Sequence, residues 1–241
     1  WVSERNLVSA ISNAGGFGVL ACGAMPPALL EAEIAATRAL TDKPFGVNLI
    51  TLHPQLDELI DICGRQGVSH VVLAGGLPSG AAIAAIKGPK EGGGAKLMCF
   101  APTAALAKKL VRSGVDAIII EGSEAGGHIG PVSLTVLAQE ILPVITDVPV
   151  FVAGGIGRGN AIAAYLEMGA SGVQLGTRFA AASESVAHEK FKAAFVRASA
   201  RDALSSVQID PRLPVIPVRA LKNAGSEAFN ERQREVAAAV D

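Results

Sequence analysis

The chain has 241 residues, half of them hydrophobic, and a formal net charge of -1 at pH 7. This apolar share excludes a disordered chain. With 21 basic against 22 acidic residues and no long run of either sign, the charges argue against a nucleic-acid surface or a polybasic membrane patch. We therefore expect one domain of α/β size whose partner is a small molecule.

Short apolar runs alternate with longer alanine-rich segments of helical period along most of the chain. This alternation predicts repeated β-α units around a parallel sheet. The first expected element is a helix with Ser3 as its cap and Glu4 in its first turn, ended by glycines. The expected strands then cover 17–21, 45–50, 70–74, 96–101, 116–120, 148–153 and 172–175. The expected helices after them cover about 27–40, 55–66, 80–87, 103–113, 134–142, 159–168 and 186–200.

A first helix without its own strand is unusual in a β-α repeat. An eight-stranded (β/α) barrel, the TIM barrel, explains it if the first strand lies upstream of Trp1. An open doubly wound sheet is the alternative architecture. Polar or glycine-rich loops follow nearly every expected strand, and the last two carry glycine clusters where barrels commonly bind phosphate. We therefore expect an α/β TIM barrel that lacks its first strand in this chain.

The sequence pattern changes after about residue 200. The segment "SSVQIDPRLPVIPVRALKN" is extended and punctuated by prolines, and "GSEAFNERQREVAAAV" returns to a helical pattern. We expect a barrel domain over 1–203 and a C-terminal part over 204–241. In that second part, an extended segment and a helix would pack on the barrel as the start of an incomplete lid.

Three cysteines, Cys22, Cys63 and Cys99, lie far apart in apolar or helical contexts. They are expected to be buried, reduced thiols. No Cys-x-x-Cys or His-x-x-x-His spacing predicts a metal site. The sequence shows neither a charged-then-apolar leader nor an apolar stretch near the roughly 20 residues that span a bilayer, so the expected location is cytoplasmic.

Two glycine-rich segments follow the last two expected strands. In "VAGGIGRGN", Gly154 and Gly155 would let backbone N–H groups approach an anionic oxygen closely. A tight strand-to-helix turn is the alternative reading of this cluster. In "QLGTRF", Gly176 and the Thr177 hydroxyl follow the very next strand. Together the two segments predict a phosphate group at this rim of the barrel.

The segment "EGSEAGGHIG" follows the expected strand 116–120, on the same rim. Gly126 and Gly127 leave room for a flat ring against the backbone, and His128 would project beyond that ring. Imidazole can take or give a proton near neutral pH, so we expect His128 to act in catalysis. The alternative is a surface histidine that only packs or caps.

Asn48 lies in "PFGVNLIT", within an apolar expected strand and near its carboxyl end. A buried amide must be hydrogen-bonded. Asn48 therefore either bridges neighbouring strands or contacts the polar edge of a ligand.

Five segments together carry a family resemblance. The segments "SNAGGFGV", "FGVNLI", "EAGGHIG", "VAGGIGRGNAIAAYLEMGASGVQLGTRF" and "ASES" resemble, in that order, those of the nitronate monooxygenase family, formerly called 2-nitropropane dioxygenases. The flavin-dependent enoyl-acyl-carrier-protein reductases are close relatives that share most of these segments. The likeness covers about residues 3–200 and implies an FMN-dependent TIM barrel. Ile129 follows the histidine where many nitronate monooxygenases have arginine and the reductases often have isoleucine.

The resemblance also implies roles for individual residues. Asn48 would contact the flavin ring, and Gly126 and Gly127 would line it. His128 would be the catalytic base or proton donor beside the ring. The residues implied to hold the ribityl phosphate are Gly154, Gly155, Gln174, Gly176 and Thr177.

The activity implied by the resemblance is the oxidation of an alkyl nitronate, or a nitroalkane, by dioxygen to a carbonyl compound and nitrite. An NAD(P)H-dependent flavin reductase of an enoyl thioester or a quinone is the alternative enzyme. From other classes, a non-redox phosphate-binding barrel and a flavin-binding module without turnover remain alternatives. The family further suggests a homodimer.

Overall fold

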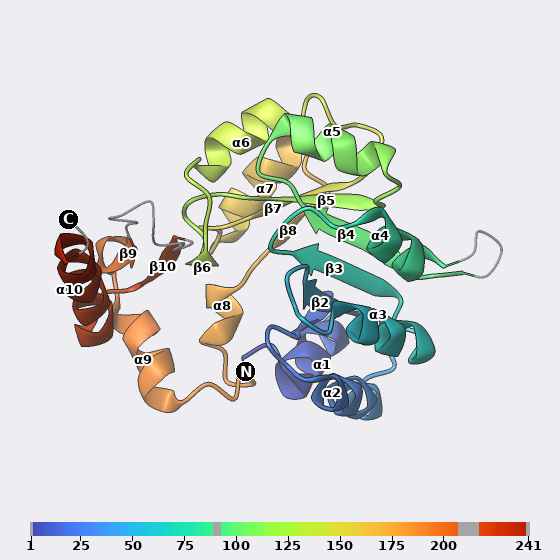
Figure 1. Ribbon diagram of the computed structural model, residues 1–241, viewed down its shortest axis with the longest axis horizontal. Coiled ribbons are helices and arrows are strands. Elements are labelled where there is room, and N and C mark those ends of the chain that lie inside the picture. The colour runs from blue at the N-terminus through green and yellow to red at the C-terminus, as the bar shows by residue number, and fades with distance from the viewer. Residues whose placement is uncertain (1, 89–92, 207–216, 240–241) are drawn as a thin grey trace.

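The computed structural model describes residues 2–88, 93–206 and 217–239. Its main feature is a seven-stranded parallel sheet in the order β1-β2-β3-β4-β5-β7-β8. The helices up to residue 167 lie on the outer side of this curved sheet (Figure 1). The strands are β1 (Gly18–Ala21), β2 (Phe45–Ile50), β3 (His70–Ala74), β4 (Lys96–Phe100), β5 (Ala117–Glu121), β7 (Val150–Ala153) and β8 (Gly172–Gln174).

The strand order decides between the two architectures considered from the sequence. A doubly wound sheet reverses its strand order at a switch point, whereas these strands follow one another around the sheet without a reversal. The sheet stays open between β1 and β8, and there the backbone N–H of Ala21 donates to the carbonyl oxygen of Ser3 at 3.0 Å. The predicted fold class is confirmed: this is a partial TIM barrel with seven parallel strands.

Each of the seven predicted strands, and the helix after it, is present within a few residues of its expected bounds. One short helix, α8, was not expected and lies between β8 and the last predicted helix of the barrel. The helices are α1 (Arg5–Asn13), α2 (Pro27–Leu40), α3 (Leu56–Arg65), α4 (Gly80–Lys87), α5 (Ala104–Arg112), α6 (Leu134–Ile141), α7 (Gly159–Glu167), α8 (Thr177–Ala180), α9 (Glu189–Arg197), the 3₁₀ turn η1 (Ala200–Asp202) and α10 (Ala224–Ala238).

Apolar side chains pack on both faces of the sheet. The larger cluster joins the outer face to the helices and includes Val47 and Leu49 of β2. It also holds the three cysteines as free, buried thiols, and burial raises the pKa of Cys63 and Cys99 to about 12. The smaller cluster lies on the inner face and contains Val19, Val72, Met98, Phe100, Ile119, Phe151 and Ala153.

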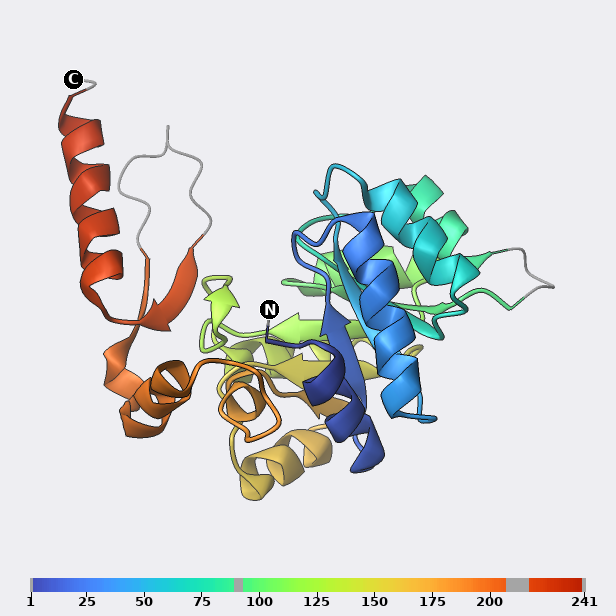
Figure 2. The ribbon, with the colours of Figure 1, turned by 90° about the horizontal axis from the view of Figure 1, so that it is seen from below.

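A second, three-stranded sheet lies at the carboxyl-end rim of the barrel. Its order is β6-β10-β9, with β6 (Gly127–His128), β9 (Ala203–Ser205) and β10 (Val218–Leu221). Figures 1 and 2 show α10 on the far side of β9 and β10 from the barrel. Part of the expected extended segment, residues 207–216, lies outside the described residues, and the proposed boundary between 203 and 204 stays a prediction. In the described ranges no helix is long and apolar enough to cross a bilayer.

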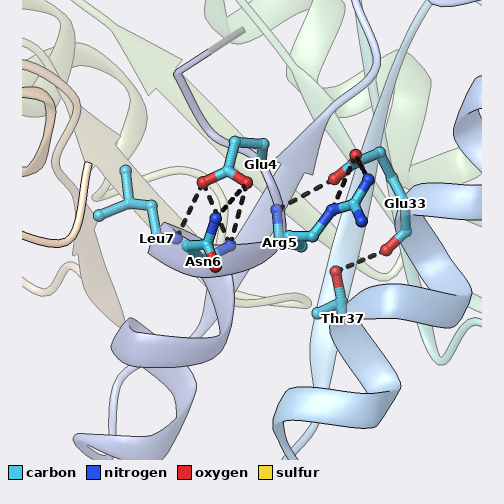
Figure 3. Close-up of polar contacts among 6 residues, drawn as sticks. All are labelled: Glu4, Arg5, Asn6, Leu7, Glu33 and Thr37. Carbon is cyan, nitrogen blue, oxygen red and sulfur yellow. Dashed lines mark hydrogen bonds and ion pairs between the residues drawn. The ribbon is translucent and has the colours of Figure 1, made fainter. Parts of the chain in front are cut away.

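The start of α1 differs from the expectation that Ser3 caps it. The N-cap is Glu4, whose carboxylate accepts hydrogen bonds from the backbone N–H groups of Asn6 and Leu7 (Figure 3). Ser3 instead lies beside β1, where its carbonyl oxygen accepts a hydrogen bond from the Ala21 N–H. A carboxylate here also interacts favourably with the positive end of the helix dipole.

An ion pair joins α1 to α2 beside this cap (Figure 3). Arg5 donates from Nε to Glu33 Oε1 at 3.0 Å and from its backbone N–H to Oε2 at 3.1 Å, and its Nη2 also contacts Oε1. The Glu33 side chain is only 8% exposed. Burial raises the pKa of Glu33, but the hydrogen bonds and charge of Arg5 outweigh burial, so this pKa lies below its ordinary value.

Replacing Arg5 with methionine should therefore destabilise the fold near neutral pH. It removes the charge and the side-chain donors of Arg5 and leaves the buried Glu33 carboxylate with only the backbone N–H of residue 5 as its partner in this pair. We expect a loss of about 2 kcal/mol in the free energy of unfolding. Because the folded-state pKa of Glu33 is depressed, the stabilisation is complete above the unfolded pKa of about 4.3 and disappears as the pH falls through the folded value. Urea unfolding of the parent and the variant at about pH 7 and about pH 3 measures the stability that Arg5→Met removes at each pH.

Arg232→Met is the matched control, because Arg232 pairs with Glu235 on α10 and their side chains are 75% and 56% exposed. It should change the free energy of unfolding by less than about 0.5 kcal/mol. Equal losses in both variants, or a loss from Arg5→Met that persists at low pH, would contradict this account of the pair.

Candidate active site

Three loops at the carboxyl ends of neighbouring strands meet at one place on the rim. A Cβ atom on Gly154 would lie 3.0 Å from the Ala125 nitrogen, and one on Gly155 would lie 2.9 Å from the Glu124 Cβ. A Cβ atom on Gly126 would lie 3.5 Å from Thr177 Oγ1. The loop after β5 thus lies against both the loop after β7 and the start of α8. The structure brings together the predicted ring-lining and phosphate segments.

The phosphate segments present unused backbone donors. Gly154 and Gly155 have φ values of +104° and +68°, a conformation that residues with a Cβ atom rarely adopt. Gly176 is the N-cap of α8, and Thr177 is its first residue. Among the hydrogen bonds of the described residues, none uses the N–H of Gly154, Gly155 or Thr177. Free N–H groups on two adjacent loops are suited to bind an anion.

His128 lies on β6, at the open side of the same loop. Its ring is exposed, and the preceding residue, Gly127, has a φ of +85°. In the antiparallel pair with β10, His128 lies opposite Val218. The backbone N–H of the following residue, Ile129, donates to the carbonyl oxygen of Pro217 at 3.0 Å. The imidazole is thus placed at the rim by a strand from the C-terminal part of the chain.

Asn48 and Gln174 share the inner face of the sheet. Asn48 is paired in register with Val72, and Gln174 with Ala153, and both partners belong to the inner apolar cluster. Asn48 Oδ1 is buried and has no hydrogen-bond partner among the described residues. This oxygen therefore forms no bridge between strands, which favours the other interpretation, contact with a ligand. Asn48 is separated from β5 by β3 and β4.

Glu121 was not singled out from the sequence, yet it ends β5 on this inner face. It is paired in register with Ala153, which is in turn paired with Gln174. Burial raises the pKa of Glu121 from 4.5 to about 7. A polar residue directly after the apolar run "AIII" was the available signal, since barrel sites lie at the carboxyl ends of strands.

Glu124 and Arg219 are two further residues that the sequence did not indicate. The Glu124 side chain accepts a hydrogen bond from the Leu134 N–H at 2.9 Å and so ties the loop to the start of α6. The Glu124 carbonyl oxygen accepts one from Arg219 Nη1 at 3.0 Å. A Cβ atom on Gly122 would collide with Leu134, so this loop requires glycine there. Within the described ranges, no group of three or more acidic, histidine or cysteine side chains could hold a metal ion.

Comparison with known proteins places this arrangement in a family. The family model described as "Nitronate monooxygenase" matches residues 1–66 and 57–240. The chain belongs to the nitronate monooxygenase family. Members of this family are flavoproteins, and the resemblance seen in the sequence is thereby confirmed.

Three relatives illustrate the range of this nitronate monooxygenase family. The chain is 37% identical over 210 residues to the (3aS,4S,5R,7aS)-5-hydroxy-7a-methyl-1-oxo-octahydro-1H-indene-4-carboxyl-CoA dehydrogenase of Rhodococcus jostii. The aligned part covers 87% of this chain and 58% of that protein. It is 33% identical over 263 residues to a nitronate monooxygenase of Paraburkholderia phytofirmans, covering 88% of this chain and 69% of the other. The structure of FabK from Thermotoga maritima matches with a TM-score of 0.90 and 37% identity, over 98% of this chain and 72% of that one.

The raised pKa of Glu121 in this nitronate monooxygenase family member has a measurable consequence. Between about pH 4.5 and about pH 7 the unfolded chain has lost this proton while the folded chain keeps it, so Glu121 lowers stability as the pH rises. Glu121→Gln removes that loss. We expect the variant to be more stable than the parent by about 2 kcal/mol at about pH 8, and the gain to shrink towards about pH 4.5.

Urea unfolding across this pH range measures the gain from Glu121→Gln. Glu231→Gln, on the exposed surface of α10, serves as the control for the loss of a carboxylate and should change the free energy of unfolding by less than about 0.5 kcal/mol. A gain that is the same at both ends of the pH range would mean that the carboxyl does not titrate near neutrality in the folded protein.

Proposed function

We propose that this chain forms most of the catalytic barrel of an FMN-dependent oxidoreductase that acts on an acyl thioester. One observation carries the catalytic part: the predicted phosphate loops and the His128 loop converge at a single rim of the sheet. On the inner face of this sheet, Asn48 has a buried oxygen with no hydrogen-bond partner among the described residues. The substrate class is supported by the 37% identity to a protein named as a CoA dehydrogenase and to FabK, an enoyl-acyl-carrier-protein reductase. Ile129 after the histidine agrees with the isoleucine that the enoyl-acyl-carrier-protein reductases often have there.

The residues present fit FMN. The free N–H groups of Gly154, Gly155 and Thr177, with Gly176 and Gln174 beside them, would hold the phosphate end. The unpaired oxygen of Asn48 would accept a hydrogen bond from the flavin ring. When bound, FMN supplies the transfer of electrons or hydride, which no side chain of the protein provides.

The protein's own contribution is the movement of one proton. The exposed His128 ring can hold a proton on a ring nitrogen and give it to, or take it from, a carbon of the substrate at the open rim. Gly126 and Gly127 keep the backbone beside it free of side chains. Glu121, half-buried on the inner face with a pKa of about 7, provides a carboxyl as a second group that holds a proton near neutral pH.

Nitronate oxidation is the second candidate, and the match to a nitronate monooxygenase at 33% identity favours it specifically. In that reaction dioxygen would convert the nitronate to a carbonyl compound and nitrite. His128 would take the proton from the α-carbon of a neutral nitroalkane. For this chain we propose small substrates of this kind only under this second candidate. That the protein forms a homodimer is likewise a proposal.

Anaerobic absorbance spectroscopy distinguishes the two candidates. The protein is saturated with FMN and then mixed with NADPH, crotonyl-CoA or ethylnitronate. Bleaching of the visible flavin band by NADPH and its recovery with crotonyl-CoA are expected for the thioester reaction. Bleaching by ethylnitronate, without a response to NADPH, would assign nitronate oxidation instead. A failure to bind FMN would overturn both.

A further inference from the structure

The segment that carries His128 is held by β10. The ladder pairs Gly127 with Arg219 and His128 with Val218, and Ile129 donates to the carbonyl oxygen of Pro217 at 3.0 Å. Among the described residues, these are the backbone hydrogen-bond partners of the loop from Gly127 to Ile129 outside the loop itself. The earlier part of the loop, in contrast, is tied to the barrel: the Gly122 N–H donates to the carbonyl oxygen of Ala153 on β7 at 3.1 Å, and the Glu124 carboxylate accepts from the Leu134 N–H on α6.

β10 is itself fixed along its other edge. It pairs with β9, where Arg219 lies opposite Ser205. Ser206 forms two bonds with Val218: its Oγ accepts from the Val218 N–H at 2.8 Å, and its N–H donates to the Val218 carbonyl oxygen at 2.8 Å. The Lys222 N–H donates to the Asp202 carbonyl oxygen at 2.8 Å. The strand opposite His128 is thus held at both ends by the chain that follows α9.

Arg219 adds a side-chain bond to this backbone pairing. Its Nη1 donates to the carbonyl oxygen of Glu124 at 3.0 Å, across 95 residues of sequence. The same Glu124 anchors the loop to α6 through its carboxylate. Arg219 therefore links the barrel-anchored end of the loop to the strand that pairs with its histidine end. A charged donor makes this hydrogen bond stronger than one between neutral groups.

We infer that Arg219 is a positioning residue for proton transfer: it fixes the 124–128 loop between the barrel and β10, and with it the imidazole of His128. The catalytic part of this inference rests on the proposed function. A guanidinium suits the task because it is planar, keeps its charge at all relevant pH values and holds its donors in a fixed fork. A lysine at this position would keep the charge but not that rigid geometry.

Amide hydrogen exchange of the flavin-free protein tests the positioning directly. Arg219→Met should speed exchange at the Ile129 amide about tenfold, as expected for the loss of a charge-assisted hydrogen bond. Amides in β3 should be unchanged, which separates a local effect from general destabilisation. Arg219→Lys should fall between the parent and Arg219→Met, and Arg232→Met, on α10, should match the parent. Unchanged exchange at Ile129 in Arg219→Met would overturn the inference, whatever reaction the enzyme catalyses.

Kinetics then test the link to His128, with crotonyl-CoA or ethylnitronate as the substrate that turns over. Arg219→Met should lower kcat about tenfold with little change in KM, because it disturbs the geometry of the proton-transfer group. In a His128→Asn background the same substitution should have almost no further effect on kcat. A full tenfold loss in both backgrounds would show that Arg219 acts independently of His128. Absence of turnover in the parent would overturn the proposed function, while the exchange experiment would still decide the positioning role.

Discussion

Replacing His128 with asparagine should lower kcat by about 10²–10⁴-fold while leaving FMN affinity nearly unchanged. The amide has a similar size and can still form hydrogen bonds, but it cannot exchange a proton near neutral pH. Because the His128 ring is exposed, its loss should also leave the free energy of unfolding within about 0.5 kcal/mol of the parent. Steady-state kinetics, FMN titration by fluorescence and urea unfolding measure the three quantities.

His188→Asn is the matched control for this substitution. His188 is also exposed and lies at the N-cap of α9, where its Nδ1 accepts a hydrogen bond from Lys190, a role that asparagine can fill. Its turnover should equal that of the parent. If the reaction is nitronate oxidation, His128→Asn should slow the neutral nitroalkane more than the preformed nitronate. Unchanged turnover with every substrate would remove His128 from the chemistry.

Gly154→Ala should weaken FMN binding by about 10–100-fold, equivalent to about 1.4–3 kcal/mol. At a φ of +104°, a Cβ atom is strained, and here it would lie 3.0 Å from the Ala125 nitrogen and 3.3 Å from the Gly122 carbonyl oxygen. These are backbone atoms, so the loops after β5 and β7 must move apart to admit the methyl group. That movement would displace the donors proposed for the phosphate.

Gly157→Ala tests whether the effect is specific to this contact. Gly157 lies in the same segment, its φ is not in the left-handed region, and a Cβ atom there would meet no other atom within 4 Å. This control should bind FMN like the parent and unfold at the same or slightly higher urea concentration. FMN titration by fluorescence quenching compares the two variants. Equal affinities for FMN would contradict the proposed phosphate site.

Much of the fold could be predicted because its signals are local. Each β-α unit carries its own apolar strand, helical period and glycine turn, so the seven strands and their helices follow from short stretches of sequence. The glycine segments around Gly126, Gly154 and Gly176 could likewise be placed on one rim, since parallel strands in a barrel end on the same side. Their predicted roles in binding FMN remain to be tested.

The parts that could not be predicted depend on distant partners. β6 has only two residues, too few for a period-2 pattern, and it exists because β10 pairs with it from about 90 residues away. Arg219 shows no sign in the sequence that it contacts the Glu124 carbonyl. Glu4 replaces the expected Ser3 as the cap of α1 because Ser3 bonds to β1, a tertiary contact that overrides local preference.

The pairing of β6 with β10 also sets an order of assembly. The barrel's strands contact neighbours that lie close in sequence, so the parallel sheet can form as the chain grows. The His128 segment gains its partner strand only after Val218 has been synthesised and the long intervening stretch has closed into a loop, a step that carries an entropic cost. During synthesis on the ribosome, we therefore expect the apolar core to be complete while the imidazole of His128 still lacks a fixed position. Catalytic competence would then be the last property that the folding chain acquires.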